Sequence, residues 1–249
     1  MPDPFLSVVI PAYNEEARIG PTLEQMAAYL DAQPYSWEMM VVSDGSSDKT
    51  DSMVDAFAAK HPNARLIAYK PNQGKGNAVR VGMLAAKGER VLFMDADLAT
   101  PPGETEKVMG HMDKGADVVI GSRPLKESKL EVRQPLHREA FGRMSNMIVQ
   151  AVGVHGIKDT QCGFKLFTQK AAKDIFSRCK MNGFSFDMEA LMIARDLGLR
   201  IDEVPIRWAD QVGSKVVLWR DAPKVLLDLF RMRFMGRKRR LIVRNDANS

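Results

Sequence analysis

The chain has 249 residues, 45% of them hydrophobic and 27% charged, and its formal net charge at pH 7 is +5. These proportions are typical of a soluble globular protein, and a chain of this length can bury one sizeable core. The sequence contains neither a signal peptide nor an apolar run of about 18 residues, which argues against a secreted or membrane-spanning protein. The two cysteines, Cys162 and Cys179, are too few for a disulfide framework, so a reducing, cytoplasmic environment is favoured.

The positive charge is concentrated near the C-terminus. Residues 224–244 hold eight basic side chains and one acidic side chain, whereas residues 1–223 hold 28 basic and 29 acidic ones. The basic character therefore belongs to the C-terminal segment, and we expect no nucleic-acid partner for the fold as a whole.

The first half of the chain alternates short apolar runs with helical patterns. Strands are predicted at residues 6–11, 37–42, 65–69, 91–98 and 117–120, the fourth of them with acidic residues at its tip. Helices are predicted after the first three strands, ending near Leu30, Lys60 and Lys87. Strands that alternate with helices through short connections predict an α/β protein with a mostly parallel sheet.

The second half is more irregular. Residues 124–135 predict a polar loop, 136–152 a helix, 159–165 the start of a short strand, 169–179 and 186–197 two helices, and 200–208 a strand. We interpret residues 1–220 as one domain and residues 221–249 as a basic amphipathic C-terminal helix and tail, with Asp228 on its polar face.

The apolar face of this C-terminal helix has two possible partners. It can pack on the domain, or it can lie on a membrane surface. The basic cluster at residues 237–240 favours an anionic lipid surface, because each basic residue near such a surface contributes about 1 kcal/mol.

The central stretch carries two acids, Asp95 and Asp97, directly after the apolar residues 91–94. Ligands of open α/β sheets bind at the carboxyl ends of strands. Side chains two residues apart in an extended segment point the same way, so these carboxylates repel unless a cation lies between them. Mg²⁺ or Mn²⁺ suits such a pair when phosphate oxygens complete the coordination. The alternative is an incidental polar exit from the strand.

Tyr13, Glu15 and Asp44 follow the first two strands and are expected at the same sheet edge. The Asp44 carboxylate can accept hydrogen bonds from a uracil or guanine base. The sequence Asp44-Gly45-Ser46 is also typical of a turn in which the aspartate bonds the backbone.

Gly74-Lys75-Gly76 opens a predicted helix. The spacing is not that of a Walker A loop, since no Ser or Thr follows the lysine. A dinucleotide-binding turn is a weaker alternative, because Val79 stands where a third glycine is needed. We favour a helix N-terminus whose amides, with Lys75, face a diphosphate.

Four basic residues are candidates for holding a phosphate. Arginine is especially suited, because its guanidinium donates two parallel hydrogen bonds to a phosphate group. The four candidates are Arg123, Arg133, Arg138 and Lys215. Surface charges without a ligand are the alternative for each of them. Arg123 is the strongest candidate, because it directly follows a predicted strand.

Several motifs together resemble the family 2 glycosyltransferases, which have the GT-A fold. They are residues 8–16 (VVIPAYNEE), 42–48 (VSDGSSD), 72–76 (NQGKG) and 95–97 (DAD). Residues 121–123 (GSR), 159–167 (DTQCGFKLF), 186–189 (FDME) and 213–215 (GSK) are similar to the dolichyl-phosphate β-glucosyltransferase group, whose relatives include the dolichyl-phosphate mannose synthases.

The resemblance implies a role for each matching residue. It implies that Pro11, Tyr13, Glu15 and Asp44 line the base and ribose pocket, that Lys75 and Asp95 face the nucleotide, and that Asp97, with Asp95, binds Mg²⁺ or Mn²⁺. It also implies that Arg123 and Arg138, with Arg133 and Lys215, hold the acceptor phosphate, and that Asp159 and Gln161 lie beside the reacting sugar. Ala99 departs from mannose synthases that have a glutamine ligand at that position.

The implied activity is inverting transfer of a hexose from a nucleotide-sugar, with UDP-glucose favoured, to a polyprenyl or dolichyl monophosphate at the cytoplasmic face of a membrane. The acceptor is already anionic, so little or no general base is needed. The alternatives are a GDP-mannose donor, a soluble acceptor and, least favoured, a non-catalytic nucleotide-sugar binding module.

Overall fold

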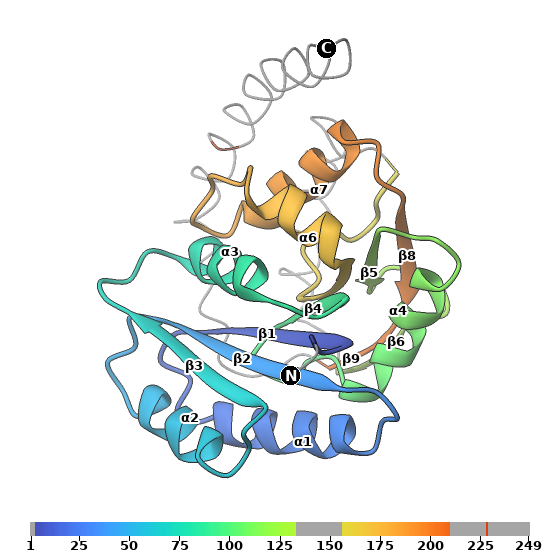
Figure 1. The fold of residues 1–249 in the computed structure, drawn as a ribbon. Helices are drawn as coiled ribbons and strands as arrows, with labels where there is room; N and C mark the ends of the chain where they lie inside the picture. Colours follow the sequence, from blue (N-terminus) through green and yellow to red (C-terminus); the bar gives the residue numbers. More distant parts are fainter. Residues whose placement is uncertain (1–2, 133–155, 210–227, 229–249) are drawn as a thin grey trace.

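The computed structural model describes residues 3–132, residues 156–209 and residue 228 (Figure 1). Its main feature is a seven-stranded sheet with the strand order β3-β2-β1-β4-β7-β5-β8. The strands are β1 (Leu6–Ala12), β2 (Trp37–Asp44), β3 (Ala64–Tyr69), β4 (Arg90–Met94), β5 (Val118–Ser122), β7 (Phe164–Thr168) and β8 (Ile201–Pro205). The predicted α/β class is confirmed.

The sheet is parallel except at β7. β1 pairs in parallel with β2 and β4, β2 with β3, and β5 with β8, whereas β7 is antiparallel to both β4 and β5. All seven residues of β1 are buried, as expected for a central strand that is covered on both faces. The carboxyl ends of β1, β2, β4 and β5 therefore meet at one edge of the sheet.

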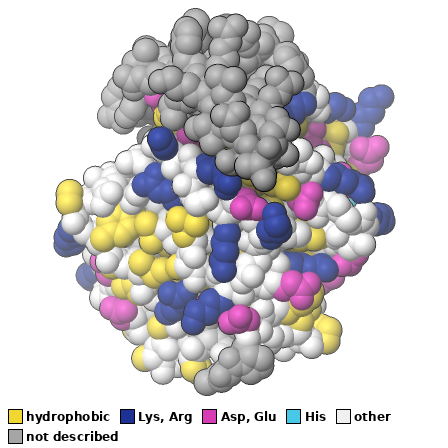
Figure 2. Space-filling view, turned by 45° about the horizontal axis from the view of Figure 1, so that its top comes forward, with side chains coloured by type: hydrophobic (Ala, Val, Ile, Leu, Met, Phe, Trp, Pro, Cys, Tyr) yellow, Lys and Arg dark blue, Asp and Glu magenta, His cyan; other side chains and the backbone are white. Residues whose placement is uncertain are grey.

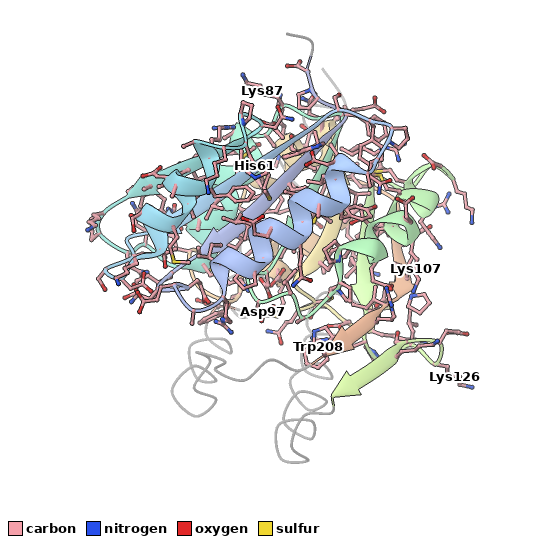
Figure 3. The ribbon with its side chains drawn as sticks, turned by 90° about the horizontal axis from the view of Figure 1, so that it is seen from below. His61, Lys87, Asp97, Lys107, Lys126 and Trp208 are labelled. Carbon is pink, nitrogen blue, oxygen red and sulfur yellow. The ribbon has the colours of Figure 1, made fainter. Side chains whose placement is uncertain are left out.

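Helices cover both faces of the sheet (Figures 1 and 3). α1 (Ile19–Asp31), α2 (Thr50–Ala58) and α4 (Thr105–Met112) lie on one face, where Tyr29 of α1 donates a hydrogen bond to Glu106 of α4. α3 (Lys75–Ala85), α6 (Gln169–Phe176) and α7 (Phe186–Asp196) lie on the other. A short 3₁₀ helix, η1 (Pro102–Glu104), precedes α4. α4 has only eight residues and is not predicted from the sequence.

A second, two-stranded sheet differs from expectation. β6 (Lys129–Val132) lies in the stretch predicted to be a loop, and it pairs in parallel with β9 (Arg207–Ala209). The predicted strand at 200–208 is thus divided into β8 and β9, which belong to different sheets. Short strands such as these depend on a distant partner, which local periodicity does not reveal.

The predicted helix at 136–152 lies outside the described residues, and so does the C-terminal segment except for Asp228. The division into residues 1–220 and 221–249 therefore stays a prediction. Asp228 is 6% exposed, and its carboxylate accepts a hydrogen bond of 2.8 Å from the Ser185 hydroxyl. The expectation that Asp228 lies on a solvated polar face is therefore wrong, because this acid is turned toward the domain.

The face of the molecule drawn in Figure 2 is mixed in charge. Figure 2 shows Lys and Arg side chains interspersed with Asp and Glu on the face that it presents. Within the described part of the chain, no helix is both long enough and apolar enough to cross a bilayer.

Candidate active site

A pocket lies at the sheet edge where β4 ends. Among the described residues it is lined by Met94, Asp95, Asp97, Ala99, Thr100, Gly163, Phe164 and Trp208. Figure 3 shows Asp97 and Trp208 at this edge, with Lys87 at the opposite one. The two acids lie at the carboxyl end of this strand as predicted, but β4 ends at Met94 rather than at residue 98, so Asp95 and Asp97 lie in a turn beyond the strand and not in one extended segment.

Asp95 is already paired with a cation. The Lys75 Nζ atom lies 2.7 Å from the Asp95 Oδ1 atom, and the Asp95 amide donates a hydrogen bond of 2.9 Å to the Gly163 carbonyl. A Cβ atom at Gly163 would lie 1.9 Å from Asp95 Oδ2, so the carboxylate occupies space that only glycine leaves open. Gly163 is therefore part of the site.

Asp97 has a different environment. Its Oδ1 atom accepts a hydrogen bond of 3.0 Å from the Ala99 amide, and Leu98 between them adopts a left-handed backbone with φ 55°. Burial raises the pKa of Asp97, and the negative charge of Asp95 raises it further. A bound cation would relieve this accumulation of negative charge.

The donor set fits a hard divalent cation. Within the described part of the chain, no group of three or more His, Cys, Asp or Glu side chains is arranged to hold a metal. Two carboxylates are nevertheless sufficient for Mg²⁺ or Mn²⁺ when substrate phosphates supply further oxygens. Ala99 has no ligating side chain, so the protein ligands would be Asp97 and the second carboxylate oxygen of Asp95, since Lys75 occupies its Oδ1 atom.

Arg123 follows β5 and is held by Asp159. Its Nε atom lies 2.6 Å from Asp159 Oδ2 and its Nη2 atom 2.8 Å from Asp159 Oδ1, which is a bidentate pair. Burial acts to lower the pKa of Arg123, but Asp159 outweighs it and raises this pKa. The guanidinium also lies over the Trp208 ring, 5.3 Å from the centroid. Arg123 therefore stays charged and fixed beside the pocket.

Asp159 has a structural role that the sequence does not reveal. It is 5% exposed, and its own amide donates to the Glu203 carboxylate. Burial acts to raise the pKa of Asp159, but Arg123 outweighs it and lowers this pKa. Asp159 is thus an ionised anchor for Arg123, and its position beside the sugar stays a prediction. Gln161 is exposed, and its contact with a sugar stays a prediction.

The prediction that the amides of the α3 N-terminus face a diphosphate is wrong. The Gln73 and Gly74 amides donate to the Asp44 carboxylate at 2.8 and 2.7 Å, and the Gly76 amide donates to the Asn182 carbonyl at 2.7 Å. These glycines are needed for close packing, since a Cβ at Gly74 would lie 2.3 Å from the Asn182 carbonyl oxygen. The Lys75 side chain is directed at the site through its ion pair with Asp95.

Asp44 is 2% exposed, and its carboxylate bonds the backbone of the residues before α3 rather than a local turn, whereas its contact with a base stays a prediction. Pro11 is buried within β1. Tyr13 is 41% exposed, and the Glu15 carboxylate pairs with Arg18 at 2.6 Å. Roles for these three in nucleotide binding also stay predictions.

Three predicted phosphate ligands, Arg133, Arg138 and Lys215, lie outside the described residues. Other residues of the site were missed by the sequence analysis. They are Gly163 and Trp208 in the lining of the pocket, and the buried ion pair of Lys165 and Asp187 behind it. Lys165 and Asp187 stand inside motifs that the sequence analysis singled out, but no local pattern indicated that they face one another.

The fold and the site define a class. The sheet is mostly parallel, and its central strand β4 leads into the sequence Asp-x-Asp. Lys75 pairs with the first of these acids, and Arg123 is held by Asp159 beside the same pocket. These are the features of a nucleotide-sugar-dependent transferase of the GT-A type.

Comparison with known proteins identifies the family. Residues 7–176 match the family described as Glycosyl transferase family 2. Dolichyl-phosphate beta-glucosyltransferase ALG5C of Trichomonas vaginalis is 37% identical over 256 residues, which cover 98% of this chain and 75% of the relative. The dolichyl-phosphate beta-glucosyltransferase of Homo sapiens is 34% identical, with 94% of this chain and 77% of the relative covered. The chain belongs to the family 2 glycosyl transferases.

Solved structures agree on the fold. Glucosyl-3-phosphoglycerate synthase of Mycobacterium tuberculosis, in complex with Mn²⁺, UDP and glucosyl-3-phosphoglycerate, has a TM-score of 0.69 at 19% identity, covering 92% of this chain and 80% of that one. Mannosyl-3-phosphoglycerate synthase of Rubrobacter xylanophilus has a TM-score of 0.69 at 19% identity, covering 94% and 75%. The GT-A prediction is therefore confirmed.

Proposed function

We propose that this chain transfers glucose from UDP-glucose to a dolichyl or related polyprenyl monophosphate. The observation that carries the proposal is the pocket in which Asp95, Asp97 and Trp208 meet, with Arg123 held over the Trp208 ring. The shared name of relatives that align with more than nine-tenths of the chain supports this acceptor and this sugar.

The donor diphosphate is assigned to the side of Lys75 and the two acids. Asp97, with Asp95, would hold Mg²⁺ or Mn²⁺, which supplies positive charge to the departing diphosphate when bound. Lys75 lies on Asp95, and burial acts to lower its pKa, but Asp95 and then Asp187 outweigh burial and raise it. Lys75 is therefore a charged ammonium group next to the expected leaving group, where it can stabilise the developing negative charge.

The acceptor phosphate is assigned to the side of Arg123. Its pair with Asp159 uses Nε and Nη2, and within the part of the chain that the structure describes Nη1 makes no hydrogen bond. A phosphate monoester is anionic at neutral pH and can attack the sugar without a general base. Attack from the face opposite the diphosphate inverts the anomeric carbon, so an α-linked donor gives a β-linked product.

The test is a transfer assay with the full chain. Radiolabelled UDP-glucose, Mn²⁺ and dolichyl phosphate in detergent should give a lipid-extractable product that mild acid releases as glucose. Label from GDP-mannose in place of UDP-glucose would assign the enzyme to mannose instead. Label that appears only in water-soluble products would contradict a lipid acceptor, and no label with any common nucleotide-sugar would contradict the proposal.

Trp208 should contribute through its ring. Trp208→Ala removes the face on which Arg123 lies, an interaction of about 1 kcal/mol, and it also opens one wall of the pocket. We expect the KM for dolichyl phosphate to rise about tenfold. Trp208→Phe keeps a ring and should retain most of the affinity. Equal KM values for wild type and Trp208→Ala would exclude this contribution.

The basic tail is proposed to bind the membrane surface. Reversing the charge of residues 237–240 to Glu should lower binding to vesicles that contain anionic lipid at least a hundredfold, since each basic residue contributes about 1 kcal/mol. Vesicle co-sedimentation at two salt concentrations measures the change. The variant leaves Asp228 and its hydrogen bond to Ser185 in place.

The control for this experiment carries the same change in charge elsewhere. Lys60, Lys70, Lys87 and Lys114 are exposed, and their replacement by Glu removes an equal number of positive charges. This control should bind vesicles much more tightly than the tail variant. Equal losses in the two variants would indicate a dependence on net charge rather than on the tail.

A further inference from the structure

A buried ion pair lies beneath the donor side of the pocket and has no part in the mechanism described so far. The Lys165 side chain is 2% exposed and the Asp187 side chain 8% exposed, and Lys165 Nζ bonds Asp187 Oδ1. Lys165 Nζ also donates to the Cys162 carbonyl. An isolated buried charge is costly, so each of these residues depends on the other.

The pair is placed by secondary structure rather than by a loop. Lys165 lies in β7 directly opposite Phe93 of β4, and Asp187 lies in the first turn of α7. Lys165 Nζ is 5.6 Å from the centroid of the Phe93 ring, and Lys75 Nζ is 5.8 Å from the same centroid. Two lysine ammonium groups therefore converge on one aromatic ring next to the pocket.

Three carboxylates act electrostatically on Lys75, namely Asp95, Asp187 and, more weakly, Asp97. Lys75 pairs with Asp95, and Asp187 is the second acid that raises the pKa of Lys75. The Asp187 Oδ1 atom is bonded by Lys165. Lys165 and Lys75 are two cations that act on the buried Asp187, so a charged Asp187 that lost Lys165 would compete with Asp95 for Lys75 in the low dielectric of the interior.

We propose that Lys165 and Asp187 are positioning residues of the donor site: Lys165 satisfies Asp187, and this leaves Lys75 on Asp95, where it meets the diphosphate. Lys165 acts through Lys75 and does not touch the substrate. The position of Lys75 follows from the geometry alone, whereas the effect on the donor rests on the proposed function.

The direct test is to determine the position of the Lys75 side chain in variants in which residue 165 is uncharged. In crystal structures of Lys165→Met and Lys165→Gln, we expect Lys75 Nζ within hydrogen-bond distance of Asp187 and away from Asp95. The glutamine keeps a hydrogen-bond donor for Asp187 and the Cys162 carbonyl, so it is the variant better suited to folding. Lys75 that remains on Asp95 in either structure would overturn the proposal.

The binding test separates this role from a contribution to folding. With Mn²⁺ present, Lys165→Gln should weaken UDP binding at least tenfold in calorimetry, and Lys165→Gln/Asp187→Asn should recover to within about threefold of wild type, because no buried anion remains to capture Lys75. A double variant that binds UDP as weakly as the single one would overturn the proposal.

The Lys75→Met variant tests whether Lys165 affects UDP binding through Lys75. Adding Lys165→Gln to Lys75→Met should cause no further loss of UDP affinity, whereas any loss of thermal stability from Lys165→Gln should persist there. Lys170→Met is the matched control, because Lys170 also pairs with an aspartate, Asp174, but on the surface of α6. A tenfold loss in the Lys75→Met background would overturn the proposal. A wild type that binds UDP without transferring glucose would instead contradict the proposed function.

Discussion

Asp97→Asn should lower the rate of glucosyl transfer at least a thousandfold, which corresponds to about 4 kcal/mol of lost transition-state stabilisation. The reason is charge. Lys75 already lies on Asp95, at 2.7 Å, whereas the Asp97 carboxylate has only a neutral backbone amide among its hydrogen-bond donors in the described residues. Asp97 therefore presents the less compensated negative charge to a metal that bridges the diphosphate.

Asparagine isolates this effect from folding. Its side-chain oxygen can still accept the hydrogen bond from the Ala99 amide, so the turn at Leu98 is retained. The unfolding temperature should change little or rise, because replacement removes the repulsion from Asp95 that raises the pKa of Asp97. The prediction is checked by the initial rate of lipid glucosylation and by the Mn²⁺ dependence of UDP binding, which should be lost.

A matched variant makes the result specific. Asp174→Asn removes a carboxylate from the surface of α6, where Asp174 pairs with Lys170, and it should keep near wild-type activity. An Asp97→Asn enzyme that retains more than about a tenth of wild-type activity would refute the assignment of Asp97 as the main metal ligand.

The sequence predicts this edge of the sheet well because its signals are local. The buried run at 91–94 ends directly before Asp95, and the strand positions of β1 to β5 follow from short apolar segments. Lys75 was expected near the nucleotide and is found on Asp95. These inferences need only the periodicity of each segment and the rule that parallel strands end at a common edge.

The remaining features depend on pairings between distant segments. Arg123 and Asp159 are 36 residues apart, and Lys165 and Asp187 are 22 apart, so their residue types were visible but their partners were not. The same limit explains the misassigned glycines. Gly74 and Gly76 resemble a phosphate loop in sequence, but the chain uses them to admit the carbonyl groups of residues 181–183 against α3.

Gly163 is a second position at which substitution should have a large effect, because the chain there also packs closely against a neighbouring segment. Gly163→Ala should lower kcat/KM at least a hundredfold, or about 2.7 kcal/mol. The added Cβ would lie 1.9 Å from Asp95 Oδ2, and the main chains are joined by the hydrogen bond from the Asp95 amide to the Gly163 carbonyl. We expect the Asp95 side chain to rotate away, because it is freer to move than the sheet.

The expected signature is loss of function with little loss of stability. Gly163 does not have a positive φ, so alanine is compatible with its backbone, and rotation of Asp95 would separate it from Lys75 without opening the core. The KM for UDP-glucose and the unfolding temperature measure the two effects separately. A Gly163→Ala protein with an unchanged KM and kcat would show that the position of the Asp95 carboxylate is not required.

Gly110 provides the control for this substitution. It lies in α4, and a Cβ there would meet no atom within 4 Å. Gly110→Ala should leave activity unchanged and stabilise the protein by about 0.5–1 kcal/mol, because alanine is favoured over glycine inside a helix. The same added methyl group is thus expected to stabilise the protein at Gly110 and to disable the enzyme at Gly163, where the carboxylate of Asp95 fills the space.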